Sequence, residues 1–149
     1  MSAYETFHVE DPLAAEMALE LVEAAYPGFA HPWLPSEDRG EWIRKHGLFY
    51  IIFKGDEFRG YFCIVQHSDG AYLHFGTTGR AFALTDVRFG LDKAQCIAAN
   101  VYGITELFCE IDEGGFVSKM VSKLGFTQIS GDKYSIKYHH GIKTESSEA

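Results

Sequence analysis

The sequence predicts an α+β domain whose mixed β-sheet carries helices on both faces, and three observations lead to this. Apolar residues recur at three- and four-residue steps over 12–26 and 84–101, which is typical of amphipathic helices. Three strand-like runs, 48–55, 58–67 and 71–75, are separated only by short turns. The last of these runs leads through a glycine-rich loop into the second long helix, which another strand-like run follows.

The first helix is expected to begin at Pro12 with Asp11 as its N-cap, and to end before Pro27 and Gly28. Its larger apolar residues repeat every four positions and are expected to form one stripe facing the core. The members of this stripe are Leu13, Met17, Leu21 and Ala25.

A proline-containing loop follows, and a short helix that starts at Ser36 or Asp38 is expected to carry Trp42 and Ile43. The three strand-like runs come next. Gly55-Asp56-Glu57 and Ser68-Asp69-Gly70 between them are residues typical of hairpin turns. The runs therefore predict an antiparallel meander.

After the glycine loop, the helix over 84–101 is expected to end at Gly103 and to lead into a strand over 104–111. Because a long helix joins the strands at 71–75 and 104–111, these two are predicted to be parallel. The rest of the chain predicts a short helix that ends at Gly125, and two closing strands. That helix would place Phe116, Met120 and Leu124 on one face, and the strands would cover 126–129 and 134–138.

The length and charge of the chain limit the functions that it can have. Its 149 residues predict a single domain over 1–140 with a polar C-terminal tail over 141–149. The formal net charge of −8 argues against nucleic acid and anionic membranes as partners, because both are bound through excess Lys and Arg. No apolar run is long enough to span a membrane, and the first residues are polar. We therefore expect a cytoplasmic protein.

Cys63, Cys96 and Cys109 stand apart in apolar segments, which favours reduced core thiols over a disulfide or a zinc site. The adjacent pair His139-His140 lacks a partner carboxylate motif, so no metal site is expected.

The stretch "AYLHFGTTGRAFALTD", residues 71–86, is the main candidate for a ligand site. Backbone N–H groups at the start of a helix bind anions, and glycines let the main chain approach a pyrophosphate closely. Short glycine patterns also occur as plain strand-to-helix turns. The loop alone therefore leaves both interpretations open.

The order of elements, the loop "GTTGRA" and a helix that ends in "KLGF" together resemble the GNAT superfamily of acyl-coenzyme A N-acyltransferases, over nearly the whole chain. The family's loop pattern is Q/R-x-x-G-x-G/A. Gly79 and Ala81 match this pattern, whereas Gly76 stands where the family has Gln or Arg. The second motif is present as Leu124-Gly125-Phe126.

The resemblance implies acetyl-CoA as a cosubstrate and an amine, on a small molecule or a protein, as the acceptor. Pantetheine would pair with the strand, and the loop amides would hold the pyrophosphate. The residues implied for coenzyme A are Leu73, Phe75, Gly76, Thr77, Thr78, Gly79, Arg80, Ala81 and Phe82. The acceptor pocket would be formed by His31, Trp33 and Trp42, unless these side chains simply fix a loop. A homodimer through the closing strands is a further expectation.

The sequence departs from the family at two positions that usually serve catalysis. The Tyr that protonates the departing thiolate is replaced by Val121, and the Asn at the start of the same helix falls near Gly114. His74, Glu110 and Tyr134 are the candidates for proton transfer in their place, and the duller alternatives are structural roles. Further candidates for the same role are His67, Glu106 and Tyr138.

Two functions remain open on the sequence. One is an N-acetyltransferase that transfers an acetyl group from acetyl-CoA to an amine, for which the acidic surface favours a cationic acceptor by steering. The other is a non-catalytic protein of the same fold with a structural or interaction role, for example phage-encoded, because fold does not fix function. A dinucleotide-binding fold is excluded, since three antiparallel strands precede the loop.

Overall fold

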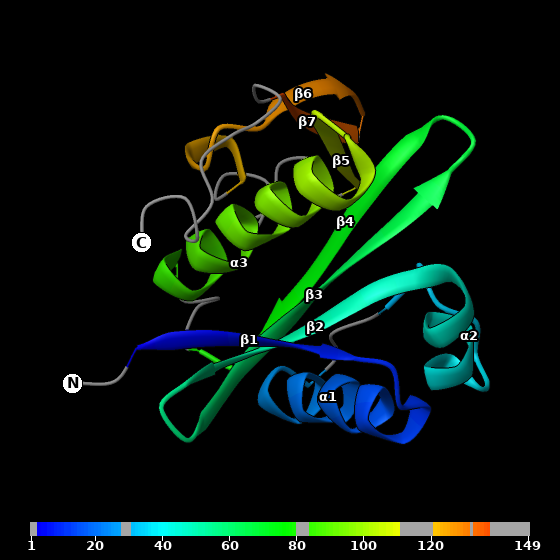
Figure 1. Ribbon diagram of the computed structural model, residues 1–149, viewed down its shortest axis with the longest axis vertical. Helices are drawn as coiled ribbons and strands as arrows, with labels where there is room; N and C mark the ends of the chain where they lie inside the picture. Colours follow the sequence, from blue (N-terminus) through cyan, green and yellow to red (C-terminus); the bar gives the residue numbers. More distant parts are fainter. Residues whose placement is uncertain (1–2, 28–30, 80–83, 111–120, 132, 138–149) are drawn as a thin grey trace.

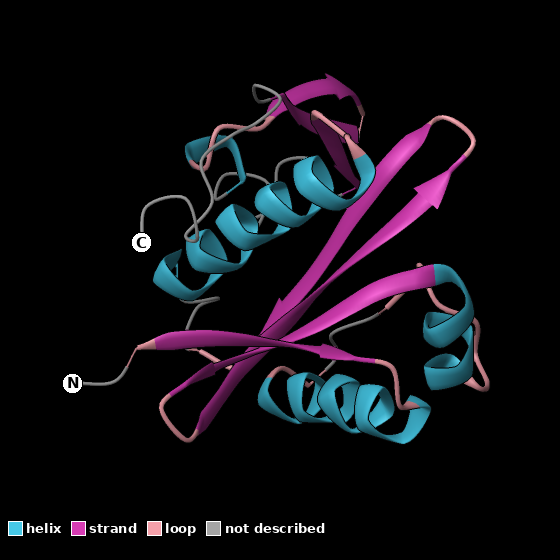
Figure 2. Cartoon of the chain, viewed as in Figure 1, coloured by secondary structure: helices cyan, strands magenta, loops and turns pink. Residues whose placement is uncertain are grey.

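The computed structural model of the chain describes residues 3–27, 31–79, 84–110, 121–131 and 133–137. Its centre is a seven-stranded sheet with the strand order β1-β2-β3-β4-β5-β7-β6 (Figure 1). Neighbouring strands are antiparallel except β4 and β5, which are parallel. The sheet is strongly twisted and has helices on both faces (Figure 2). The predicted fold class is confirmed.

The predicted meander is formed by β2 (Gly47–Lys54), β3 (Glu57–His67) and β4 (Gly70–Thr77). The β3–β4 ladder runs from His67 opposite Gly70 to Gly60 opposite Thr77. Strand β4 therefore continues past the predicted end at Phe75, and the first two residues of the expected loop belong to the strand.

Strand β1 (Tyr4–Val9) was not predicted. It lies at one edge of the sheet and pairs only with β2, so most of its side chains are partly or fully exposed. An edge strand of this kind lacks the apolar alternation that marks a half-buried strand. Five of its six residues are polar or aromatic, so the strand resembles a polar N-terminal segment.

Helix α1 (Pro12–Ala25) has the predicted bounds, and the Asp11 carboxylate accepts a hydrogen bond from the Leu13 amide at 3.2 Å. The predicted apolar stripe is wrong, because Leu13, Met17 and Leu21 are exposed. The helix instead buries its small face, and small side chains let the helix axis approach the sheet closely. That face consists of Ala15, Ala18, Leu19 and Val22.

Helix α2 (Arg39–His46) begins after Asp38, one of the two predicted starts, whose φ of 55° is left-handed. It buries Ile43 against the sheet. Trp42 is half-buried on the same side of the sheet, where α1 and α2 cover β2 and β3.

Helix α3 (Leu84–Ile97) continues into a π-helical turn, η1 (Ala98–Tyr102), so the predicted long helix is confirmed with a change of pitch near its end. Gly103 closes it in the left-handed conformation, φ 68°, and donates its N–H to the carbonyls of Ala98 and Ala99. The helix packs on the opposite face of the sheet from α1.

The parallel strand β5 (Glu106–Glu110) follows α3, as predicted, and β7 (Lys133–Lys137) pairs with both β5 and β6 (Thr127–Ser130). Residues 121–123 are helical, and Gly125 ends that turn with φ 108°. Outside the described residues lie Gly114, Phe116, Met120, Tyr138, His139, His140 and the expected tail 141–149.

The two faces of the sheet carry separate apolar cores. Beneath α3, Phe62, Leu73 and Leu107 pack with helix residues such as Leu91. Beneath α1 and α2, the core is built on Phe49, Tyr61, Cys63 and Val65 with α1 side chains such as Leu19. Cys63 and Cys109 are buried and Cys96 is half-buried, and none forms a disulfide. Among the described helices, none is long and apolar enough to cross a membrane.

The corrected orientation of α1 predicts opposite outcomes for two leucine substitutions. Leu19→Ala should lower the free energy of unfolding by about 2–5 kcal/mol, because Leu19 is fully buried and a cavity would remain. Leu13→Ala, on the exposed face at 66% exposure, should change it by less than about 0.5 kcal/mol. Urea denaturation of both variants checks this, and equal losses would contradict the observed orientation.

Candidate functional site

Strands β4 and β5 separate soon after they pair. Their ladder contains two pairs, Ala71 with Leu107 and Tyr72 with Phe108. The register would next bring Leu73 opposite Cys109, yet β5 there pairs only with β7 among the described residues. Alternate backbone N–H and C=O groups of β4 from Leu73 onward therefore face away from β3 with no strand partner. This edge can pair with an extended ligand, as edge strands pair with peptides.

A polar clamp closes the paired end of this gap. Lys133 of β7 contacts Asp69 at 3.1 Å and lies 4.5 Å from the ring centre of Phe108. The Tyr72 hydroxyl donates a second hydrogen bond to Asp69 at 2.8 Å. These bonds lower the pKa of the Asp69 carboxyl. The clamp keeps the strands together at one end and leaves the other end open.

The end of β4 is held by hydrogen bonds within the chain. Thr77 donates its hydroxyl hydrogen to the Arg59 carbonyl at 2.9 Å and accepts the Gly79 N–H at 3.0 Å. The Thr78 amide donates to the same Arg59 carbonyl at 3.1 Å. Two amides of the expected phosphate loop therefore already have partners. The remaining loop residues Arg80, Ala81 and Phe82 lie outside the described residues.

Gly76 stands where the family pattern has Gln or Arg, and packing explains why. A Cβ at this position would come 2.7 Å from Cε2 of Tyr61 and 3.0 Å from Cγ1 of Val22. The ring of Tyr61 therefore lies against the β4 backbone, in space that any side chain would need.

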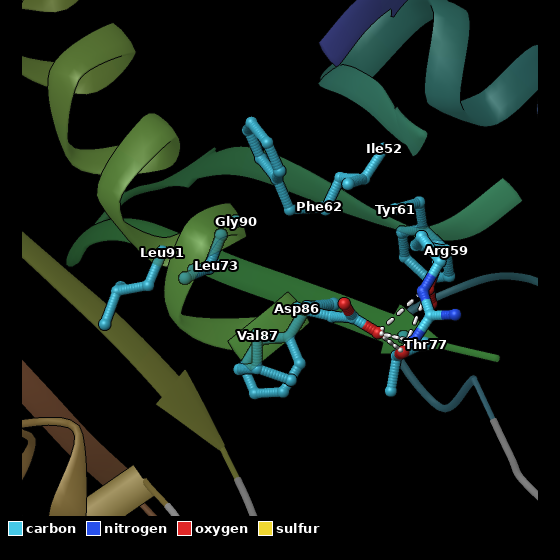
Figure 3. A pocket seen from close by; sticks show the side chains of 12 residues that line it. Ile52, Arg59, Tyr61, Phe62, Leu73, Thr77, Asp86, Val87, Gly90 and Leu91 are labelled. Atoms are coloured by element: carbon cyan, nitrogen blue, oxygen red, sulfur yellow. Dashed lines mark hydrogen bonds and ion pairs between the residues drawn. The ribbon is translucent and has the colours of Figure 1, made fainter. Parts of the chain in front are cut away.

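A buried carboxylate anchors the start of α3. Asp86, 2% exposed, accepts hydrogen bonds from Nε and Nη2 of Arg59 at 3.0 and 2.7 Å (Figure 3). It also accepts a hydrogen bond from the Tyr4 hydroxyl. Burial, together with the hydrogen bond to Asp86, raises the pKa of Tyr4 to about 12. The Asp86 hydrogen bonds also raise the pKa of Arg59. Thr77 lies 3.5 Å from the same carboxylate, so this network joins β1, β3, β4 and α3.

A small pocket lies between this network and the sheet, with a volume of about 10 Å³ (Figure 3). Leu73 and Phe75, both expected to contact coenzyme A, are in its lining together with Gly76 and Thr77. As it stands, its volume suits a single water molecule.

His74 points to the opposite face of the sheet, toward α1 and α2. Its ring stacks on Trp33 with ring centres 4.3 Å apart and an angle of 2° between the planes. Burial lowers the pKa of His74 to about 3, and the neighbouring His67 and His31 act in the same direction. The imidazole is therefore neutral at physiological pH, and its Nε2 makes no hydrogen bond among the described residues.

The three residues predicted for the acceptor pocket do lie together. Trp33 lies 6.1 Å from Trp42 and 6.3 Å from His31, measured between ring centres. Tyr61, which the sequence did not single out, joins this aromatic cluster at 5.9 Å from His31 and 6.4 Å from Trp33. The cluster covers His74 on the face of the sheet that carries α1 and α2.

A network of ion pairs and hydrogen bonds contacts this cluster through His31. His31 contacts Glu23 at 2.9 Å, and Arg39 binds both Glu23, at 2.6 Å, and Glu16. The hydrogen bond from Arg39 lowers the pKa of the Glu23 carboxyl. Burial lowers the pKa of His31 and outweighs its contact with Glu23. The network ties the loop at 31–38 to α1 and α2.

The remaining sequence candidates are dispersed. Glu110 is exposed at the end of β5, where strand alternation places it on the same face as His74, two residues past the paired end of the gap. Tyr134 is 4% exposed in the core beneath α3, on the other face. Glu106 pairs with Lys137 in register, and His67 is exposed. Val121 is fully buried in the same core as Tyr134. No cluster of three or more His, Cys, Asp or Glu able to hold a metal occurs in the described part of the chain.

Sequence reasoning missed Tyr61, Arg59 and Asp86. The turn at Ser68-Asp69 sets the β3–β4 register, so it already implies that Tyr61 faces Gly76. Asp86, by contrast, is separated from its partners by 27 and 82 positions, and no local pattern marks it.

The buried His74 predicts a stability that depends on pH. Its pKa is about 3 when folded and about 6.5 when unfolded, so the unfolded state binds more protons between these values. The contribution of the buried, neutral His74 to the free energy of unfolding is fully present above pH 6.5 and is lost as the pH falls toward 3. His74→Phe, which keeps a ring on Trp33, should flatten the loss of stability measured by urea denaturation below pH 6.5. The exposed His8→Gln is the control and should follow the wild type.

Comparisons with known proteins place this geometry in one fold. No protein-family model matches the chain, and no curated protein is similar to it in sequence. Solved structures are similar in shape. The PaiA N-acetyltransferase of Thermoplasma acidophilum, in complex with coenzyme A, superposes with a TM-score of 0.66 at 18% identity, covering 91% of this chain and 99% of that one.

Two further structures show the same likeness. FeeM, an N-acyl amino acid synthase from uncultured soil microbes, has a TM-score of 0.68 at 14% identity over 99% of this chain and 98% of its own. RimL, the α-N-acetyltransferase of ribosomal protein L7/L12, in complex with coenzyme A, has 0.65 at 14% over 90% and 93%. The chain therefore has the fold of the GNAT acetyltransferases, as the sequence resemblance predicted.

Proposed function

We propose that this protein is an acyl-CoA-dependent N-acyltransferase that transfers an acetyl group to an amine. The observation that carries the proposal is the separation of β4 from β5 beside the β4–α3 loop. Along Leu73–Phe75 the β4 backbone has no strand partner on this side among the described residues, and pantetheine would pair there in an extended conformation. Two structures with the same fold contain coenzyme A, which supports this ligand.

The loop would hold the pyrophosphate through backbone amides near the start of α3. Because the amides of Thr78 and Gly79 already have partners, the binding amides would come from 80–82, or Gly79 would exchange its bond to Thr77 for a phosphate oxygen. Asp86 is a carboxylate in the first turn of α3, so Arg59 must neutralise it before an anion can bind there.

In the transfer step, the amine nitrogen attacks the thioester carbon, the carbon–sulfur bond breaks, and the sulfur leaves as a thiolate. One proton must move from the nitrogen to the sulfur. A free N–H of β4 near Leu73–Phe75 would polarise the thioester carbonyl. His74 stands on the acceptor side and would accept the proton, while Glu110 would act through water across the gap. Tyr134 would serve the thiolate only from the opposite face.

A second candidate function is a non-catalytic protein of the same fold with a structural or interaction role. Two observations favour it: Val121 occupies the position of the usual acid, and two loop amides are engaged within the chain. Acetyl-CoA binding separates the two functions, because a protein without coenzyme A chemistry has no reason to bind it.

Acetyl-CoA should raise the melting temperature of the wild type by mass action, as measured by thermal shift, with the affinity from calorimetry. Thr77→Val removes the hydroxyl that positions Gly79 and should raise the Kd several-fold, whereas Thr77→Ser keeps the hydroxyl and should bind like the wild type. No shift at millimolar acetyl-CoA with folded protein would overturn the enzymatic function.

His74→Ala should leave the Kd for acetyl-CoA unchanged and lower kcat by about 10²-fold, the usual contribution of a positioned proton acceptor. Calorimetry measures the first quantity and release of the coenzyme A thiol the second. An unchanged kcat would assign His74 a structural role as the partner of Trp33.

A further inference from the structure

The hydroxyl of Tyr61 is buried without a hydrogen-bond partner of ordinary geometry among the described residues. The residue is 1% exposed, and its ring stacks on Phe49 at 5.0 Å. Burial raises its pKa well above the ordinary value, and the nearby Trp33 indole opposes this only weakly. A buried polar group without a partner destabilises the folded state, because it has lost its hydrogen bonds to water. Phenylalanine would fill this space without that cost, so the hydroxyl points to a ligand.

The second buried atom of this kind is Nε2 of His74. In the β3–β4 register, Tyr61 faces Gly76 and Cys63 faces His74, so Tyr61 and His74 are diagonal neighbours on one face of the sheet. Trp33 contacts both rings, with centres 4.3 Å from His74 and 6.4 Å from Tyr61. The two side chains that carry these buried polar atoms thus lie on one face of the sheet, and both have ring contacts with Trp33.

We propose that Tyr61 Oη and His74 Nε2 together bind the nitrogen of an uncharged, weakly basic amine, and that this amine is the acceptor; the inference rests on the proposed acyl transfer. A neutral amine has two N–H groups to donate and one lone pair. If the hydroxyl oxygen accepts one hydrogen and the imidazole nitrogen accepts the other, the lone pair remains available for the thioester carbon.

The charges around Tyr61 and His74 favour a neutral amine over an ammonium ion. His74 and His31 are both held neutral by burial, so a cation entering the same surroundings would lose its hydration in the same way. The carboxylates of the neighbouring ion network are already paired, Glu16 with Arg39 and Glu23 with both Arg39 and His31. The acidic surface attracts cations at long range. The carboxylates beside this region are already paired, however, and would not balance the charge of an ammonium ion.

The proton balance is consistent with this class of amine. As the nitrogen attacks, it becomes an N–H⁺ group, and its proton passes to His74 Nε2 and then to the thiolate, giving the amide and the coenzyme A thiol. A base of low pKa takes a proton only from a strong acid. A weakly basic amine gives such an acid when it attacks, whereas an alkylamine gives a much weaker one.

Trp33 stacks on His74, so the acceptor reaches these atoms by taking the place of the indole. Trp42, at 6.1 Å from Trp33, offers a second aromatic surface beside it. A flat acceptor would stack on the His74 ring in place of the Trp33 indole. Arylamines combine a flat ring with a weakly basic nitrogen, and they are the class that this arrangement fits.

The test uses aniline and benzylamine, which have similar shapes, as acceptors with acetyl-CoA at neutral pH. Aniline is uncharged under these conditions and benzylamine is cationic. Release of the coenzyme A thiol gives kcat/KM for each. We expect aniline to be preferred, and Tyr61→Phe to lower kcat/KM for aniline about tenfold or more while the Kd for acetyl-CoA stays unchanged. Tyr50→Phe removes a hydroxyl on the other face and should match the wild type in both.

The possible outcomes are distinct. A preference for benzylamine, or a Tyr61→Phe variant as active as Tyr50→Phe, overturns the role of Tyr61 and His74 while leaving acyl transfer intact. Acetyl-CoA binding without thiol release for either amine overturns this acceptor class. No binding of acetyl-CoA by the wild type overturns the proposed function itself. Urea denaturation completes the test, because Tyr61→Phe should be at least as stable as the wild type.

Discussion

The rest of the site depends on the ion pair between the Asp86 carboxylate and Arg59. The carboxylate is almost fully buried at the start of α3, and a buried charge is tolerated only when it is paired and hydrogen-bonded. Arg59 supplies the charge, and the Tyr4 hydroxyl supplies a further hydrogen bond. Because the partners come from β1 and β3, the helix can take only one position relative to the sheet. The end of β4 is held to β3 in the same way, through Thr77 and the Arg59 carbonyl.

This constraint separates the two sides of the sheet into different chemical environments. On the side of α3, Leu73 and Phe75 line a small apolar pocket, and the charges are gathered at its end. On the side of α1 and α2, His74 lies among aromatic rings and is kept neutral. Adjacent residues of one strand therefore face two different environments, because successive side chains point to opposite faces. A ligand in the gap between β4 and β5 would have access to both.

Much of the fold could be predicted from the sequence, because its signals are local. Hairpin turns, the Asp11-Pro12 start of α1 and the glycine that ends α3 each act over a few residues. The errors arose where tertiary packing decides. Leu13, Met17 and Leu21 repeat at helical spacing, yet the alanine face lies against the sheet, and β1 is an edge strand without apolar alternation. The grouping of the aromatic cluster was predicted in part: His31, Trp33 and Trp42 lie together, whereas Tyr61 has the pattern of an ordinary strand residue. Asp86 could not be predicted, because its partners are remote in sequence.

The two-pair ladder between β4 and β5 has a mechanical consequence. Between β2 and β3 the register runs over eight pairs, whereas among the described residues two pairs join β1–β4 to β5–β7. The sheet thus consists of two parts, β1–β4 and β5–β7, whose backbones pair at Ala71 and Tyr72. Beyond these two residue pairs, side chains hold the two parts together. They belong chiefly to the core beneath α3, which includes Leu73 and Leu107. The relative orientation of these two parts of the sheet therefore depends on the volume of core side chains such as Leu73 and Leu107.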